Sequence, residues 1–362
     1  MRAHVTRLLT LFLVGGAFAV VGLVLLVGDR PTPEIPPPPP PLPPAVVTMG
    51  DSTLSGEGAG NYVPGTDGAN GNWCHRSPAA PVHQLRLPGS VKRINLACSG
   101  AKAGLVGLEA RPNHPEGSQA RRLADIAERY RITDIVVQVG ANDDPSFVDV
   151  LNKCVGAWVA RAPGGCAEEL RQEWPKRVQR MQPKVLDALR DIRTVMDRAG
   201  YERDGYSLVV QSYASPVGPG IAPELQDLSG CPLLTSDVKW VRSTAVPQLS
   251  EGLREVAEQV GARFLDLSRA GYGHEACTGG DKAPGTEWFT RLTVDWQALK
   301  HEKRAPHAMQ ESFHANATGH AQFARCLSDF LTGTRQQAVC LPDSEGNLTA
   351  VSPEVAAQRT SR

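Results

Sequence analysis

The chain has 362 residues, of which 41% are hydrophobic and 21% charged, and its 38 basic side chains balance its 38 acidic ones. A formal net charge of zero leaves no basic field to attract nucleic acid, so we expect no nucleic-acid partner. The composition also excludes collagen, a coiled coil and wholesale disorder, and a single long apolar run excludes a multi-span membrane protein.

That apolar run extends from Leu8 to Gly28 and follows Arg2 and Arg7. About 20 apolar residues cross a bilayer as a helix, whereas the apolar region of a cleaved signal is shorter and ends at small residues. Residues 1–28 are therefore expected to form a cytoplasmic stub and a single-pass transmembrane signal anchor, with the remaining chain outside the cytoplasm. Cleavage near Ala17–Ala19, which would give a secreted protein, is the alternative.

Residues 29–44 form a proline-rich segment, in which Pro36–Pro41 is uninterrupted. Such a sequence adopts the stiff polyproline II helix, which rises about 3.1 Å per residue. We expect a stalk that lifts a globular domain off the membrane.

An alternation of strand and helix patterns begins at Ala45. The strands are apolar almost throughout, which is typical of a parallel sheet covered on both faces, and the alternation predicts a three-layer α/β/α sandwich over residues 45–335. Residues 215–239 and 268–310 read as long loops near the ligand-binding edge of the sheet. Residues 336–362 read as a C-terminal tail, polar and disordered after Cys340. The expected strands are 45–49, 91–96, 134–139, 206–213 and 263–267, and the expected helices are 119–130, 175–199, 247–260 and 317–331.

The eight cysteines show no paired spacing typical of a zinc site. In an exported chain they are expected to form disulfides, although eight cysteines allow 105 pairings and some could be free buried thiols. Pairing between neighbours would close loops outside the strands. The expected pairs are Cys74–Cys98, Cys154–Cys166, Cys231–Cys277 and Cys326–Cys340.

Small polar residues follow each of the first three predicted strands, and a late histidine precedes the last predicted helix. These residues are Ser52, Gly100, Asn142 and His314. Carboxyl ends of neighbouring parallel strands meet at one edge, so the pattern predicts an acyl-transfer site.

Each residue has a separate chemical task. The Ser52 hydroxyl needs a base to become a nucleophile, His314 is the candidate base, and Glu311 is the candidate acid that orients its ring. The oxyanion of a tetrahedral intermediate needs fixed donors, which the backbone N–H groups of Ser52 and Gly100 and the side-chain amide of Asn142 would supply. Glycine at position 100 would let the backbone approach closely.

Four blocks, in this order, resemble the SGNH (GDSL) hydrolases. They are Gly50-Asp51-Ser52 with Ser55-Gly56-Glu57-Gly58-Ala59-Gly60, then Gly100, Gly140-x-Asn142-Asp143 and His314. The flanks of Cys74 and Cys98 look like the exported, disulfide-rich actinobacterial branch. The resemblance covers about residues 46–331. It implies a flavodoxin-like sheet, ester hydrolysis without metal or cofactor, and the residue roles given above.

Two positions depart from the family pattern. Glu311 stands where the family usually has Asp, and Ala315 where Pro is frequent, so a backbone carbonyl is the alternative group to orient His314. Asp51 is expected to bind backbone N–H groups, Asn316 to cap the last helix and His320 to be structural. His75, His83, His114, His274, His301 and His307 belong to no recognised block.

The sequence therefore predicts a monomeric, membrane-tethered extracytoplasmic serine esterase or lipase that acts through an acyl-serine intermediate. Its substrate would be a lipid, glycolipid, polysaccharide or small acyl ester. The alternative is an O-acyltransferase that uses the same site on an envelope sugar or lipid, and a non-catalytic binding module is the third reading.

Overall fold

The computed structural model describes residues 41–109, 114–280 and 283–360. The expected anchor at 1–28 and the stalk up to residue 40 lie outside the described residues, and Pro44 already belongs to the first strand. No helix in the described part of the chain is long and apolar enough to cross a membrane. The chain divides at Pro41, and all features below belong to the second unit, Leu42–Arg362.

A seven-stranded sheet in the order β2-β1-β3-β4-β5-β6-β7 forms the centre of this unit. All strands are parallel except β7, which pairs antiparallel with β6. In β1 every residue from Ala45 to Gly50 is buried, as expected for a strand covered on both faces. The predicted parallel α/β fold is confirmed. The strands are β1 (Pro44–Gly50), β2 (Lys92–Asn95), β3 (Arg131–Gln138), β4 (Ser207–Gln211), β5 (Arg263–Asp266), β6 (Gln337–Pro342) and β7 (Leu348–Val351).

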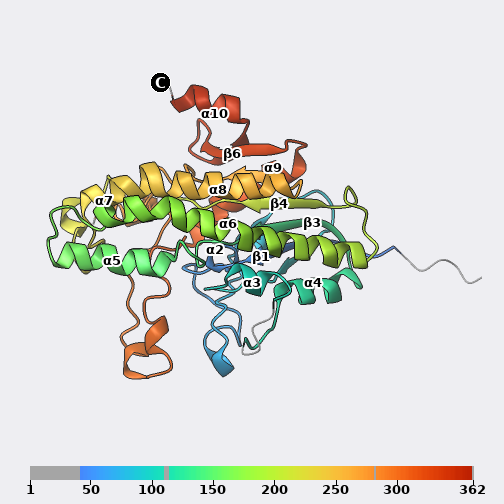
Figure 1. The fold of residues 1–362 in the computed structure, drawn as a ribbon, viewed down its shortest axis with the longest axis horizontal. Helices are drawn as coiled ribbons and strands as arrows, with labels where there is room; N and C mark the ends of the chain where they lie inside the picture. Colours follow the sequence, from blue (N-terminus) through green and yellow to red (C-terminus); the bar gives the residue numbers. More distant parts are fainter. Residues whose placement is uncertain (1–40, 110–113, 281–282, 361–362) are drawn as a thin grey trace, which may run out of the picture. The chain divides into compact units, whose positions relative to one another are not determined.

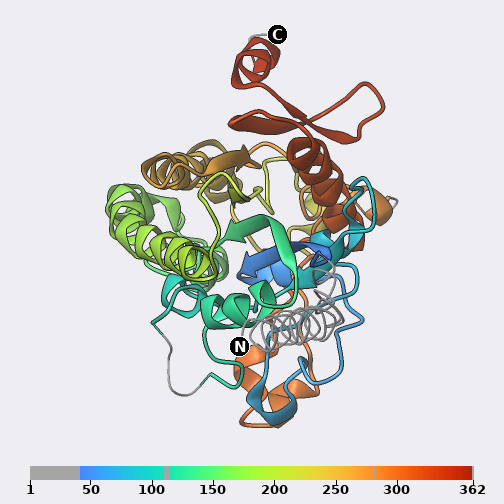
Figure 2. The ribbon, with the colours of Figure 1, turned by 90° about the vertical axis from the view of Figure 1, so that its right-hand side faces the viewer.

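Helices cover both faces of the sheet (Figure 1). α6 packs against α4 and α8 on one side, whereas α9 lies on the other side (Figure 2). The helices are α2 (Ser52–Ser55), α3 (Ala103–Val106), α4 (Gln119–Ala127), α5 (Phe147–Val159), α6 (Ala167–Arg198), α7 (Thr235–Trp240), α8 (Val246–Gln259), α9 (Ala317–Thr332) and α10 (Pro353–Thr360). The π-helix η4 (Val241–Ala245) joins α7 to α8.

The longest helix, α6, begins at Ala167, well before its predicted start at Pro175. Pro175 and Pro183 both lie inside it. Because proline removes one helical hydrogen bond, it usually marks a helix boundary, and the predicted helix therefore started at Pro175. Both prolines lie on the exposed face, together with Arg171 and Gln179, whose carbonyl groups lose their donors. Water can therefore satisfy these carbonyl groups, and the helix continues.

The segment 215–239 is irregular except for one short 3₁₀ helix and the start of α7, and 268–310 contains only 3₁₀ turns among its described residues. These two long loops were predicted.

Helix α5 was not predicted from the sequence. Cys154 is its only buried residue, and Val148 and Val159 are exposed, so no apolar stripe marks the helix. The 3₁₀ helices are η1 (Ala69–Gly71), η2 (Pro81–Gln84), η3 (Pro223–Leu225), η5 (Pro284–Thr286), η6 (Ala298–Lys300) and η7 (Ala305–His307).

The prediction of a disordered tail after Cys340 is wrong. Strand β6 adds to the sheet beside β5, β7 pairs back onto β6, and α10 follows. The buried Cys340 is bonded to Cys326 of α9, which ties β6 to the domain. The tail has too few apolar residues to fold alone, and the sheet edge supplies the partners that its backbone needs.

All eight cysteines form disulfides, and none is free. The Cα atoms of the bonded pairs lie 4.0 to 6.3 Å apart. These are the four pairs between neighbouring cysteines that the sequence predicts: Cys74–Cys98, Cys154–Cys166, Cys231–Cys277 and Cys326–Cys340.

Candidate active site

The carboxyl ends of β2, β1 and β3 lie side by side and bring three polar loops to one edge of the sheet. The loops are bonded to one another: Asp51 N donates to Gln138 O, and Cys98 N to Gly50 O, each at 3.0 Å. A Cβ on Gly50 would lie 1.9 Å from Gln138 O, so only glycine fits between these strands.

Ser52 is the first residue of the short helix α2, and Asp51 caps this helix. Asp51 Oδ1 accepts a hydrogen bond from Thr53 N at 3.2 Å, and Oδ2 accepts one from the Tyr213 hydroxyl. Burial raises the pKa of Asp51 to about 7, although these hydrogen bonds oppose the rise. Asp51 thus has the structural role expected for it, and it fixes the backbone that presents Ser52.

The imidazole of His314 lies against the Ser52 hydroxyl, with 2.8 Å between Nε2 and Oγ. His314 comes from the loop before α9, which pairs with the segment around Thr290: Thr290 N donates to His314 O at 2.8 Å. Phe313 adopts a positive φ of 59°, a conformation that costs a non-glycine residue on the order of 1 kcal/mol. The contact joins side chains 262 residues apart, within the reach that a nucleophile and its base require.

Glu311 does not take the position expected of the orienting acid. Its Oε1 accepts a hydrogen bond from the Tyr62 hydroxyl at 2.6 Å, whereas His314 Nδ1 lies 3.2 Å from the Ser312 carbonyl oxygen. The longer Glu side chain points away from the ring, so the backbone carbonyl, the alternative left open by the sequence, orients the imidazole. Burial lowers the pKa of His314, while the charges of Glu57 and Glu311 and the Ser312 carbonyl oppose this shift.

The two expected oxyanion donors from neighbouring loops also lie at this edge. Asn142 Nδ2 donates to Ala101 O at 3.3 Å, which ties the loop after β3 to the loop that contains Gly100. Gly100 has a φ of +74°, and a Cβ placed on it would meet no atom within 4 Å. The left-handed conformation by itself favours glycine at this position.

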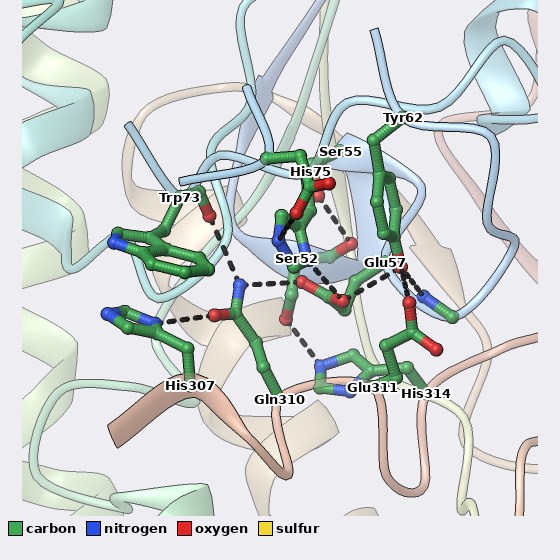
Figure 3. A network of polar contacts seen from close by, with 12 residues as sticks. Ser52, Ser55, Glu57, Tyr62, Trp73, His75, His307, Gln310, Glu311 and His314 are labelled. Atoms are coloured by element: carbon green, nitrogen blue, oxygen red, sulfur yellow. Dashed lines mark hydrogen bonds and ion pairs between the residues drawn. The ribbon is translucent and has the colours of Figure 1, made fainter. Parts of the chain in front are cut away.

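Four further residues near His314 were assigned no role from the sequence: Glu57, Tyr62, His75 and Gln310. Glu57 lies between the other three (Figure 3). His75 Nδ1 is 2.8 Å from Glu57 Oε1, Tyr62 Oη is 3.0 Å from the same oxygen, and Gln310 Nε2 is 2.8 Å from Oε2. The one available signal was a carboxylate between two glycines, Gly56 and Gly58, directly after the nucleophile block.

An apolar cavity of about 140 Å³ opens beside Ser52 and His314. It extends between α5, α6, η4 and α8, and residues of the loops after β3 and β4 also line it. Its apolar walls include Phe147, Leu151, Val217, Leu249, Phe289 and Phe313. Such a cavity accepts an apolar group attached to the reacting carbon.

Among the described residues, two groups each hold three potential metal-ligand atoms that lie within 4.8 Å of one another. They are Cys74, Cys98 and His114, and Cys154, Cys166 and Asp237. Each group contains a disulfide. Disulfide sulfurs are not thiolates, so these groups do not offer the ligand set of a zinc site.

The chain is similar in sequence and in fold to known lipases. Residues 48–322 match the model of the GDSL-like lipase/acylhydrolase family. Lipase 2 of Streptomyces coelicolor is 26% identical over 274 residues, which cover 73% of this chain and 84% of that protein. Among solved structures, an extracellular lipase from Streptomyces rimosus is 19% identical, with a TM-score of 0.49. Phospholipase A1 from Streptomyces albidoflavus is 20% identical, with a TM-score of 0.47. Each alignment covers 76% of this chain and 94% of the other. The family match spans most of the described chain, and the protein therefore belongs to the GDSL-like lipase/acylhydrolase family and is an ester hydrolase.

Proposed function

We propose that this protein is an extracytoplasmic serine esterase that cleaves carboxylic esters through an acyl-Ser52 intermediate. The observation that supports this most is the 2.8 Å contact between Ser52 Oγ and His314 Nε2. His314 Nε2 takes the hydroxyl proton as Oγ bonds to the acyl carbon, and the imidazolium then gives this proton to the departing alcohol. Water, deprotonated by the same imidazole, releases the acid and restores Ser52.

The negative oxygen of each tetrahedral intermediate would bind to three donors at the sheet edge. These are the N–H groups of Ser52 and Gly100 and the side-chain amide of Asn142. One N–H of this amide is bonded to Ala101 O, which fixes its direction. The second makes no hydrogen bond to any described residue and is available to the oxyanion.

The apolar cavity supports an ester with a hydrocarbon acyl group, because Ser52, to which the acyl carbon would bond, lines this cavity. Four disulfides support a location outside the cytoplasm, since disulfides persist in oxidising compartments. A membrane anchor at residues 8–28 would hold the domain at the outer face of the membrane.

Hydrolysis of p-nitrophenyl butyrate by the full chain tests this function. We expect Ser52→Ala to lower kcat at least about 1000-fold without changing the thermal unfolding temperature. Ser243→Ala, at an exposed serine of η4, is the matched control and should retain full activity. A fluorophosphonate probe should add its mass to the Ser52 peptide, and undiminished turnover by Ser52→Ala would assign the nucleophile elsewhere.

A further inference from the structure

The buried residue Glu57 connects the segment that carries Ser52 to the segment that carries His314. Its backbone N–H donates to Ser52 O at 3.1 Å, and its Oε2 accepts from Gln310 Nε2 at 2.8 Å. The Glu57 carbonyl oxygen accepts from His320 Nε2 on α9 at 3.0 Å. One residue therefore contacts the nucleophile helix, the loop before His314 and the helix after it.

The residue after Glu57 packs directly against His314. A Cβ on Gly58, whose φ is +84°, would lie 3.0 Å from His314 Cβ and 2.7 Å from Ala315 O. Gly58 N also donates to Tyr62 Oη at 3.1 Å, and Tyr62 Oη in turn contacts Glu311 Oε1. The backbone at Glu57 and Gly58 is thus a surface on which the His314 loop rests.

The Glu57 carboxylate is ionised although its side chain is wholly buried. Burial by itself would raise its pKa, but the hydrogen bond to His75 and the charges of His314 and His75 hold that pKa below its ordinary value. In the other direction, the Glu57 charge raises the pKa of His314 more than the charge of Glu311 does. Glu57 is therefore a fixed anion that acts on the imidazole without a direct hydrogen bond.

We propose that Glu57 is the positioning residue of this site, which seats the His314 loop against the nucleophile helix and supplies the buried negative charge that stabilises the His314 imidazolium. The inference rests on the proposed function. When Ser52 Oγ bonds to the acyl carbon, its proton moves to His314 Nε2 and the ring becomes positive. In a triad an acid bonded to Nδ1 balances this charge. Here Nδ1 faces the Ser312 carbonyl oxygen, which carries only a partial charge, and the Glu57 carboxylate supplies negative charge in place of such an acid.

Other titratable groups surround this pair of residues. The charge of Glu311 raises the pKa of His314, as the charge of Glu57 does, whereas the charge of His75 lowers it. His75 Nε2 also lies 3.3 Å from Asp67 Oδ1, and Glu57 and Asp67 both raise the pKa of His75 against the effect of burial. Burial lowers the pKa of His320 to about 4, so this residue is neutral near pH 7. His307, bonded to Gln310, also has a lowered pKa because of burial.

The test is the pH dependence of kcat for p-nitrophenyl butyrate with the full chain carrying Glu57→Gln. Without the anion the imidazolium is less stable and the pKa of His314 falls. We therefore expect kcat on the high-pH plateau of the profile to fall about tenfold. The acid limb, where kcat drops because His314 is protonated, should move to lower pH by roughly one unit. A residue with only a structural role would lower the plateau and leave the limb in place. Glu57→Asp keeps the charge and should restore the wild-type limb, and Glu128→Gln, at an exposed site on the far end of α4, is the charge-matched control.

A second variant tests the opposite sign and does not depend on the folding of Glu57→Gln. His75→Asn keeps a donor near Nδ1 for Glu57 but removes a positive charge, so the acid limb should move to higher pH. The proposal is overturned if kcat falls at the wild-type acid pH in both folded variants, Glu57→Gln and His75→Asn. If Glu57→Gln does not fold, an unchanged acid limb in His75→Asn alone overturns it. Fluorophosphonate labelling of Ser52 in the same samples separates this outcome from a failure of the proposed function, because a different labelled residue would refute the mechanism itself.

Discussion

The apolar cavity makes a quantitative prediction about acyl chain length. Its volume of about 140 Å³ is close to that of the cavity of roughly 150 Å³ known to hold benzene, so about six acyl carbons should fit. Ala214, a half-buried residue three positions after β4, lines this cavity. Replacing it by Leu places three more carbon atoms in the space, and these would displace about three methylene groups of a hexanoyl chain.

Each methylene group removed from water contributes about 0.8 kcal/mol. Exclusion of three such groups therefore costs about 2.4 kcal/mol of transition-state binding, which corresponds to a fall of roughly 60-fold in kcat/KM. An acetyl group has only one carbon beyond the carbonyl and occupies little of the cavity, so it should be hydrolysed as before. The expected signature of Ala214→Leu is thus a ratio of hexanoate to acetate kcat/KM that is about 60-fold lower than in the wild type.

The assay is a series of p-nitrophenyl esters from acetate to octanoate, with Ala160→Leu as the control at an exposed alanine after α5. The control should leave the whole series unchanged. If Ala214→Leu lowered kcat/KM equally for every ester, the cavity would not hold the acyl chain and the reasoning above would be refuted.

Two further predictions concern Glu311 and the disulfides. Glu311→Gln keeps an acceptor for Tyr62, so kcat should fall less than about threefold, well below the effect of Glu57→Gln; a loss near 10⁴-fold would instead show that Glu311 orients the ring. Replacing Cys231 and Cys277 together by Ala opens a loop of 46 residues, which should lower the free energy of unfolding by up to about 4 kcal/mol; an unchanged urea midpoint would contradict a stabilising role.

The outline of the site could be predicted from the sequence because its residues follow strand ends. Ser52 and Asn142 come directly after β1 and β3, which are adjacent in the sheet, so local sequence and parallel pairing place them at one edge. Glu311 was harder to assign. Whether a carboxylate three residues before a histidine reaches Nδ1 depends on the turn between them, and here the positive φ of Phe313 and the hydroxyl of Tyr62 direct it elsewhere.

The amino-acid sequence by itself determined the parallel sheet and identified Ser52, Asn142 and His314 as candidate site residues, because apolar strands and strand-end motifs are local patterns. It left 105 cysteine pairings open, and the structure selected the four between neighbours. Only the tertiary structure decided that Glu57 and His75 belong beside His314 and that the tail completes the sheet. The physical reason is the same in both cases. A buried carboxylate and a marginal strand are stable only with partners distant in sequence, His75 and Gln310 for the carboxylate and β5 for the strand, and no local pattern records these partners.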